Sequence, residues 1–343
     1  MSPDGNRPTL VNPMPVLTIG IPTYNRSTQL METVRRLLPD LSSKVCLLIV
    51  DNASDTPARE VLSSFMRPES PHIRIVRNKW NIGAPANVLR TVELCETAYL
   101  WILADDDLLS VDSVKTVLGA VYEYRDIDFF RFFSPAIAKT PKGEVSTVAD
   151  LLRAVDSFGQ LIWLSNCVFR VEGVRKHLRW AYQYLSSNVP QLVLQLMTLS
   201  NSGRGCIINT EIVSYGHPTS DRAYDLVRVY AQLPLLLRLP LPWNEKRALA
   251  SLLRSSGIPS PIRFVALLIR YAQVIEPKDL QALYRSAWSD AMLGGGLLSR
   301  IWVALVGLIL WVSRFPWAMG ATQQLTRLKS ISPADAKKAS DRL

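Results

Sequence analysis

Short apolar runs alternate with longer amphipathic segments along the first half of the chain. Five runs are apolar enough to form buried strands, namely Val16–Ile21, Val45–Val50, Ile73–Val76, Tyr99–Leu103 and Ile127–Phe133. The segments between them have helical periodicity over Ser27–Leu38, Asp55–Phe65, Ala86–Cys95 and Val111–Tyr122. This alternation predicts an α/β domain whose sheet is mostly parallel and carries helices on both faces.

Polar clusters follow four of these predicted strands. They occupy residues 22–26, 51–55, 78–87 and 105–107. Ligands of open α/β sheets bind outside the carboxyl ends of the strands, so these clusters predict one site along one edge. The chain has no G-x-G-x-x-G after its first strand and no G-x-x-x-x-G-K-[ST], so a dinucleotide or P-loop site is weakly supported.

Three consecutive aspartates, Asp105, Asp106 and Asp107, follow the apolar run Tyr99–Leu103. Adjacent like charges repel, and a hard cation such as Mg²⁺ or Mn²⁺, with substrate phosphates completing its shell, would neutralise them. The other reading is an acidic turn before the helix that starts near Ser110. The three companion clusters favour the metal site.

Composition and charge narrow the class of protein. A hydrophobic content of 48% over 343 residues excludes general disorder. The four cysteines have no metal-ligand spacing, which predicts reduced and mostly buried thiols. The net charge of +10 is concentrated in the last third while the first half is near neutral, which argues against a nucleic-acid groove along the whole molecule.

The C-terminal third is helical in pattern, with arginines among leucines. Its apolar segment Ile301–Ser313 has thirteen uncharged residues between Arg300 and Arg314, against the roughly 20 that span a bilayer. It fits an interfacial helix, a membrane span from about residue 291, or a buried core helix. The expected organisation is a flexible leader at 1–14, a sheet domain at 15–220, a basic apolar helical region at 221–329 and a tail at 330–343.

Four motifs in order, Ile21–Arg26, Val50–Asp55, Asn78–Asn87 and Ala104–Asp107, resemble family 2 glycosyltransferases of the GT-A fold. The resemblance is closest to bacterial enzymes that build surface polysaccharide, including abequosyltransferase-like ones. It is strong over residues 14–135 and looser over 136–220. It implies the GT-A fold with a helical C-terminal extension.

The resemblance also implies roles for individual residues. The nucleotide pocket would be lined by Pro22, Thr23, Tyr24, Arg26, Asp51, Asn52, Asn81, Gly83 and Asn87. Asp51 would accept a hydrogen bond from the base, with Asn52 in support. Asp105 would face the ribose and Asp106 the ribose or the sugar, and Asp107 would bind Mg²⁺ or Mn²⁺ with Asp105 as a second ligand. The cation would stabilise the charge that develops on the diphosphate leaving group.

Family 2 enzymes invert the anomeric centre, so a base must deprotonate the acceptor hydroxyl. The family commonly has a Glu-Asp pair in the helical segment after the sheet, whereas Ser186–Gln191 of this chain has no acid. Asp156, Glu172 and His217 are the weak candidates that remain, and His217 could instead be a further metal ligand. The stretch Gly159–Arg170 resembles the family's acceptor-side strand. Its residues Trp163, Ser165 and Asn166 are expected on the acceptor side, where Trp163 either stacks on a sugar or belongs to the core.

The sequence therefore predicts an enzyme that moves a sugar from a nucleotide-sugar to a glycan. The basic C-terminal region suggests a lipid-linked acceptor and a peripheral location at the cytoplasmic face of the inner membrane, with no nucleic-acid partner. The alternatives are a non-catalytic GT-A protein that binds nucleotide-sugar or glycan, and a transferase that acts on polyprenyl phosphate. The bare charge pattern also fits a basic adaptor protein.

Overall fold

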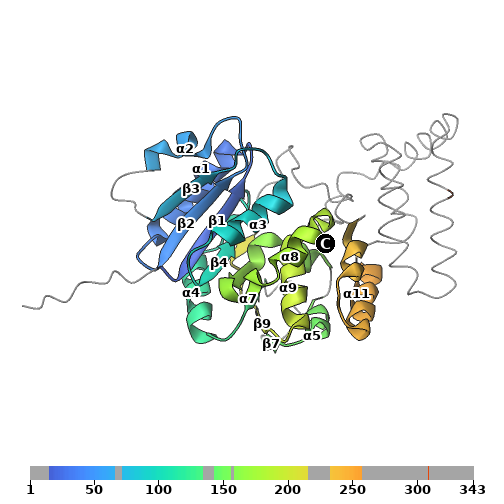
Figure 1. Ribbon diagram of the computed structural model, residues 1–343. Helices are drawn as coiled ribbons and strands as arrows, with labels where there is room; N and C mark the ends of the chain where they lie inside the picture. The colour runs from blue at the N-terminus through green and yellow to red at the C-terminus, as the bar shows by residue number, and fades with distance from the viewer. Residues whose placement is uncertain are drawn as a thin grey trace, which may run out of the picture.

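A single large sheet forms the centre of the molecule (Figure 1). The computed structural model describes residues 15–65, 72–133, 143–155, 158–214 and 232–256, together with residue 308. The strands of the large sheet are β1 Leu17–Thr23, β2 Val45–Asp51, β3 Ile73–Arg77, β4 Tyr99–Ile102, β6 Phe129–Phe132, β7 Gly143–Val145, β8 Cys167–Arg170 and β9 Gly205–Ile208. A separate small sheet pairs β5 Leu108–Leu109 with β10 Val213–Ser214.

The strand order is β3-β2-β1-β4-β8-β6-β9-β7. The pairs β3–β2, β2–β1, β1–β4 and β6–β9 are parallel, whereas β8 and β7 run antiparallel to their neighbours. Thr23 lies beside Asp51 and Asp51 beside Arg77, so the first three strands end at one level. The mostly parallel sheet, with its polar clusters along one edge, is confirmed.

Helices cover both faces of the sheet, as the alternation of apolar segments predicts. One core contains α3 (Ala84–Leu94), α5 (Val148–Arg153), α9 (Pro190–Ser200) and α11 (Trp243–Ser256). The other contains α1 (Ser27–Leu37), α2 (Ala58–Val61) and α4 (Ser113–Glu123). Along β4, Leu100 and Ile102 belong to the first core and Tyr99 and Trp101 to the second. Successive strand residues point to opposite faces, so an entirely apolar strand marks a sheet buried on both sides.

Shorter helices complete the described part of the chain. They are α6 Phe158–Ile162, α7 Val171–Arg175 and α8 Leu178–Gln183, with the 3-10 helices η1 Leu38–Asp40, η2 Ser63–Phe65, η3 Leu164–Asn166, η4 Leu185–Ser187 and η5 Leu233–Arg238. Two expectations need correction. The helix predicted over Asp55–Phe65 is reduced to α2 and η2, because the Asp51 carboxylate holds the backbone N–H groups of Ser54 and Ala58 in a turn. The stretch 159–170, compared above with an acceptor-side strand, is α6, η3 and only then strand β8.

Helix α3 approaches strand β1 closely at Gly20. A Cβ atom at this position would collide with the Thr91 methyl group of α3 and would lie 2.9 Å from Cδ1 of Leu100. Both neighbours are fully buried and have little room to move. The absence of a side chain at Gly20 therefore sets the distance between α3 and the sheet.

We expect Gly20→Ala to lower the free energy of unfolding by about 1–3 kcal/mol, the usual cost of overpacking a core. Urea denaturation measures this change. The matched control is Gly119→Ala in α4, where nothing lies within 4 Å of the new Cβ and a gain of about 0.5–1 kcal/mol is expected. Equal stability of Gly20→Ala and the original protein would contradict the close contact.

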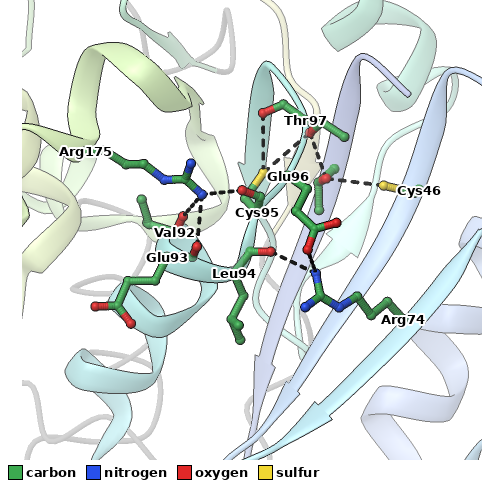
Figure 2. Close-up of polar contacts among 10 residues, drawn as sticks. Cys46, Arg74, Val92, Glu93, Leu94, Cys95, Glu96, Thr97 and Arg175 are labelled. Atoms are coloured by element: carbon green, nitrogen blue, oxygen red, sulfur yellow. Dashed lines mark hydrogen bonds and ion pairs between the residues drawn. The ribbon is translucent and has the colours of Figure 1, made fainter. Parts of the chain in front are cut away.

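Two arginines anchor the C-terminal end of α3 (Figure 2). Arg175 Nη2 donates to the carbonyl oxygens of Val92, Glu93 and Cys95. From β3, Arg74 Nη1 donates to the Leu94 carbonyl at 3.2 Å and pairs with Glu96 at 2.5 Å. The last carbonyls of a helix lack partners within the helix, and cations there are favourable. These contacts fix the C-terminal end of α3. Its N-terminal end follows Gly83 at the polar edge of the sheet.

All four cysteines are free, and three of them are buried. Figure 2 shows Cys46 and Cys95 joined through hydroxyl groups beside the same end of α3. Thr18 Oγ1 lies 3.3 Å from Cys46 Sγ and 2.8 Å from Thr97 Oγ1, and Thr97 Oγ1 lies 3.4 Å from Cys95 Sγ. The thiols thus lie within a polar network at the amino end of the strands.

Part of the expected C-terminal region packs on the sheet domain. Leu233, Leu236, Leu249 and Leu253 of η5 and α11 belong to the core that also contains α3 and α9. The domain boundaries at residues 14, 220 and 329 remain predictions. Among the helices of the described residues, none combines the length and apolarity of a membrane span. The segments 1–14, 291–319 and 330–343 lie outside the described residues, apart from residue 308.

Candidate functional site

Asp51 ends β2 and organises the loop that follows. Its Oδ1 accepts the backbone N–H of Ser54 at 2.9 Å, and its Oδ2 accepts that of Ala58 at 3.1 Å and Arg77 Nη1 at 2.6 Å. Burial raises the pKa of Asp51, but these hydrogen bonds and the guanidinium outweigh it and lower the pKa below its ordinary value. The carboxylate is therefore an ionised anchor, with 0% of the residue exposed.

Arg77 is the exposed partner of this anchor. Its guanidinium is 41% exposed and also donates to the Ser54 carbonyl at 2.8 Å. Sequence reasoning placed Asp51 against a nucleotide base and did not single out Arg77. Arg77 is the last residue of β3 and lies level with Asp51, and this position at the strand end could have identified it as a site residue. With Asp51 enclosed, Arg77 is the member of the pair that presents polar groups to solvent.

Asparagines connect the ends of β2 and β3 to the start of α3. Asn78 Nδ2 donates to Asn52 Oδ1 at 3.0 Å and to Asn87 Oδ1 at 2.8 Å. Asn52 Nδ2 donates to Asn81 Oδ1 at 2.8 Å, and Asn87 Nδ2 donates to the Val50 carbonyl at 2.8 Å. The structure thus brings together the predicted residues Asn52, Asn81 and Asn87, and adds Asn78 as the residue that bridges two of them.

The loop before α3 is shaped by these amides. Asn52 Oδ1 also accepts the backbone N–H of Ile82, and Asn81 Oδ1 accepts that of Gly83. Gly83 has φ of 83° and precedes the first residue of α3, a conformation that favours glycine. The exposed side chains of Trp80 and Ile82 project from this loop. The result is a rigid rim at the N-terminus of a helix, where backbone N–H groups favour anions.

The end of β1 is tied to the loop after β2. Asn25, with φ of 52°, exchanges hydrogen bonds with Asp55: its Oδ1 accepts the Asp55 backbone N–H at 2.7 Å and its Nδ2 donates to Asp55 Oδ2 at 3.0 Å. Its own N–H donates to Ser54 Oγ. Between Thr23 and Asn25, Tyr24 is 42% exposed, and Pro22 is partly buried. Tyr24 therefore offers an aromatic face beside the polar edge.

Asp105 is a buried carboxylate with two donors from the β1 end. Thr23 Oγ1 donates to its Oδ2 at 2.7 Å and Arg26 Nη1 to its Oδ1 at 2.8 Å. Thr33 Oγ1 of α1 donates to its carbonyl oxygen at 3.0 Å. Burial raises the pKa of Asp105, and Arg26 and Thr23 oppose that rise only in part. Arg26 also pairs with Asp106 at 2.7 Å, so one guanidinium bridges the first two carboxylates of the triplet.

Asp107 contacts a different part of the chain from Asp105, the segment that contains Trp163 and Ser165. Its Oδ2 accepts the Trp163 indole Nε1–H at 2.9 Å and the Ser165 hydroxyl at 2.5 Å. Burial raises the pKa of Asp107 to about 6 despite these two donors, and the charges of Asp106 and Asp105 add to the rise. Arg26 does not pair with it among the described contacts. Asp107 is thus the member of the triplet whose negative charge is least compensated by the protein.

The triplet fits a hard divalent cation in its chemistry. All its donors are carboxylate oxygens, the ligands that Mg²⁺ and Mn²⁺ prefer. Within the described residues no group of three His, Cys, Asp or Glu side chains is placed to hold a metal by itself. A cation would therefore need oxygens from a bound phosphate, which is the usual arrangement for Mg²⁺. On this geometry Asp107 would be the principal protein ligand of such a cation.

Residues 18–172 match the family model described as glycosyl transferase family 2. This part of the chain is therefore similar to family 2 glycosyltransferase domains. The match includes the four polar clusters that follow the strands, and it includes Trp163 and Ser165, which contact Asp107. No curated protein matches the chain.

Two solved structures are similar to this chain in fold. S. aureus TarS 1–349 in complex with UDP-GlcNAc is 14% identical with a TM-score of 0.56, over 87% of this chain and 91% of that one. The mannosyltransferase PcManGT from Pyrobaculum calidifontis, in complex with GDP-Man and Mn²⁺, is 13% identical with a TM-score of 0.51, over 93% and 88%. These likenesses concern the fold, and the predicted GT-A fold is confirmed.

Of the three candidate bases, one, Glu172, lies in the described part of the chain. Glu172 is exposed on α7, just after Arg170, and Arg170 pairs with Tyr99 at the start of β4. Glu172 therefore lies at the sheet edge opposite Asp105, Asp106 and Asp107, which follow the end of β4. Asp156 and His217 lie outside the described residues.

The acid-free stretch 186–191 contacts the segment that carries Trp163, Ser165 and Asn166. Gln191, at the start of α9, donates from Nε2 to the Ile162 carbonyl at 2.6 Å. Trp163 is half-buried with its indole N–H on Asp107, while Ser165 and Asn166 are buried. Ser165 Oγ also accepts the Ala104 N–H at 2.9 Å. Ser165 therefore holds the loop of the triplet, and Trp163 is the more accessible of the three predicted acceptor residues.

Proposed function

We propose that the chain transfers a sugar from a nucleoside diphospho-sugar to a glycan acceptor, with inversion and with the help of Mg²⁺ or Mn²⁺. The observation that carries the proposal is the single edge on which Asp105, Asp106 and Asp107 lie beside the Asp51 and asparagine pocket. A nucleoside diphosphate needs polar partners for its base and ribose, and counter-charge for its phosphates. The asparagine network offers the polar partners, and a cation held by the triplet would supply the counter-charge.

The donor is proposed to bind along the ends of β1, β2 and β3. Tyr24 supplies an exposed aromatic face for a base, and the asparagine network presents the rim that ends at Gly83. The remaining pocket residues are Pro22, Thr23, Arg26, Asp51, Asn52, Asn81 and Asn87, and Arg77 joins them as the exposed partner of Asp51. Structures of similar fold were solved with UDP-GlcNAc and with GDP-Man and Mn²⁺, which supports a nucleotide-sugar as the donor class.

The cation is proposed to sit at Asp107, with Asp105 as the weaker second ligand. When bound, it supplies positive charge to the diphosphate as the glycosidic bond breaks. Trp163 and Ser165 orient the Asp107 carboxylate through the same oxygen, Oδ2. Arg26 compensates Asp105 and Asp106, so the protein limits the repulsion within the triplet before any cation arrives.

The acceptor is proposed to be a lipid-linked glycan of bacterial surface-polysaccharide synthesis, as for abequosyltransferase-like enzymes. Trp163 stands beside Asp107 and offers an apolar ring for the C–H face of a sugar. The basic C-terminal third supports a peripheral position at the cytoplasmic face of the inner membrane, since each basic residue near anionic lipid contributes about 1 kcal/mol.

Calorimetric titration with UDP, GDP, CDP and dTDP, each with and without Mn²⁺, tests the donor site. We expect one of them to bind, and to bind at least about tenfold more tightly with Mn²⁺, because the cation adds phosphate contacts at Asp107. Glu172→Gln, at the opposite sheet edge, is the matched control and should bind as the original protein does. A folded protein that binds none of the four nucleotides would contradict the proposal.

A second candidate function is non-catalytic binding of a nucleotide-sugar or glycan. It rests on one observation, the absence of an acid at 186–191, where Gln191 instead holds the Ile162 carbonyl. Release of nucleoside diphosphate that depends on an added acceptor distinguishes transfer from binding. Polyprenyl phosphate belongs among the acceptors tested, because transfer to it is the nearest enzymatic alternative.

A further inference from the structure

Arg131 of β6 is a fully buried guanidinium without an acidic partner among the described residues. Burial lowers the pKa of Arg131, although the neighbouring Cys167 opposes this. Burying such a charge costs free energy unless hydrogen bonds compensate it. The contacts of Arg131 therefore indicate why the domain keeps a charge in this position.

The guanidinium donates mainly to backbone carbonyl oxygens of one segment. Arg131 Nη1 donates to Leu161 O at 2.9 Å, and Nη2 donates to Gln160 O and, at 3.4 Å, to Trp163 O. The carbonyl between these, Ile162 O, accepts Gln191 Nε2 at 2.6 Å. Four consecutive carbonyls, those of residues 160–163, thus accept hydrogen bonds from two buried side chains on β6 and α9.

Two further groups complete the surroundings of the guanidinium. Arg131 Nη1 lies 2.9 Å from Cys167 Sγ and 3.4 Å from Gln195 Oε1, and Gln195 Nε2 lies 3.2 Å from the same sulfur. Arg131 Nε has no partner. The position of Arg131 therefore leaves one of its hydrogen-bond donors, Nε, without an acceptor. Its two Nη groups reach every one of its partners.

The segment held in this way carries one wall of the candidate site. Trp163, whose carbonyl Arg131 contacts, donates its indole N–H to Asp107, and Ser165 follows two residues later on the same carboxylate. Side chains on β6 and α9, which do not touch the triplet in any described contact, therefore fix the backbone that presents its hydrogen-bond donors.

We propose that Arg131 and Gln191 are positioning residues, a carbonyl clamp that holds residues 160–163 so that the Trp163 indole meets Asp107. The effect on transfer rests on the proposed function, whereas the effect on Trp163 does not. The planar fork of arginine spreads its donors over two terminal nitrogens, whereas lysine has one ammonium nitrogen from which to reach the same three carbonyls. Gln191 is the last residue of the acid-free stretch 186–191, so this stretch contributes a hydrogen bond that positions residues 160–163.

Hydrogen exchange of the Trp163 indole N–H, followed by NMR, tests the clamp independently of activity. Trp163→Phe identifies the signal by its loss. We expect Arg131→Lys and Gln191→Met each to speed this exchange about tenfold, the scale expected when a hydrogen bond that orders the segment is lost. The control is Arg153→Lys, an exposed arginine on α5, which should leave the rate unchanged.

Unchanged exchange in the folded variants would overturn the proposal. Gln191→Met decides the question if Arg131→Lys does not fold, since it removes one donor to the same segment without touching the buried charge. A Trp163 signal that is unprotected in the original protein would also overturn it.

Kinetics test whether the clamp acts through Trp163. With kcat/KM as the readout, Arg131→Lys combined with Trp163→Phe should be no slower than Trp163→Phe alone, because both changes remove the same contact with Asp107. Fully additive losses would overturn the inference. If the original protein shows no turnover, the proposed function fails, and the exchange experiment still decides the clamp.

Discussion

Asp107→Asn is expected to abolish metal-dependent nucleotide binding and turnover, and at the same time to make the folded protein more stable at neutral pH. Loss of turnover should be at least about 100-fold, as when one group that stabilises transition-state charge is removed. The asparagine carbonyl oxygen can still accept the hydrogen bonds from Trp163 and Ser165 that Asp107 Oδ2 accepts. The wall of the site should therefore remain in place.

The gain in stability follows from the raised pKa of Asp107, about 6 in the folded protein against 3.8 as its ordinary value. Below pH 3.8 the carboxyl group is protonated in both states, and folding incurs no penalty. As the pH rises from 3.8 through about 6, the unfolded chain loses this proton while the folded protein retains it, so stability falls. Above about pH 6 the full penalty, on the order of 1–3 kcal/mol, is present.

Urea denaturation of Asp107→Asn at several pH values between 3.5 and 8 measures this effect. The difference from the original protein should grow through this pH range and level off above pH 6. Asp126→Asn, an exposed carboxylate, is the control and should show little change. Addition of nucleotide and Mn²⁺ should stabilise the original protein only. Wild-type turnover by Asp107→Asn would exclude Asp107 as the metal ligand.

Asp51→Asn is expected to have the opposite effect on stability, a loss of about 2–4 kcal/mol, because it disrupts a buried and paired carboxylate. Asp51 accepts the N–H groups of Ser54 and Ala58 and the Arg77 guanidinium. An amide NH₂ group would face one of these donors. The lower end of the range allows for the solvent exposure of Arg77.

The pH dependence of this loss also has a definite sign. The pKa of Asp51 is lowered in the folded protein, so its contribution is present above the ordinary pKa of 3.8 and is lost as the pH falls through the folded value. Asp51→Asn should therefore be most damaging near neutral pH and least damaging in acid. Urea denaturation with Glu60→Gln of α2 as the matched control measures this. A loss that is constant down to pH 3 would contradict an ionised anchor.

The sheet and its polar edge could be predicted from the sequence because their signals are local. A strand that is buried on both of its faces appears in the sequence as a continuous apolar run. Because the strands are mostly parallel, the residues that follow each run lie at one edge of the sheet. The register confirms this for Thr23, Asp51 and Arg77. The start of α3 was expected at Ala86 but lies at Ala84, since Pro85 is tolerated in a first helical turn.

The contacts that orient the site could not be predicted, because they join residues far apart in the sequence. Arg131 reads as an interruption in the run Ile127–Phe133, and only the folded chain places it against the carbonyls of residues 160–163. Trp163 and Asp107 are likewise separated by 56 positions. The prediction of a helix over Asp55–Phe65 was wrong for a related reason. The side chain of Asp51, which precedes this segment, competes with the helix for backbone N–H groups.

The packing of η5 and α11 has a consequence for how much of the chain forms one cooperative unit. Leu236, Leu249 and Leu253 are buried in the same core as α3 and α9, and α11 contacts α5 and α6. A shortened protein that stopped at residue 220 would expose this apolar face to water and would be prone to aggregation. Within the described part of the chain, these contacts extend the cooperative unit at least to Leu253 of α11, so the folding free energy of the sheet domain depends in part on a stretch well beyond its family motifs.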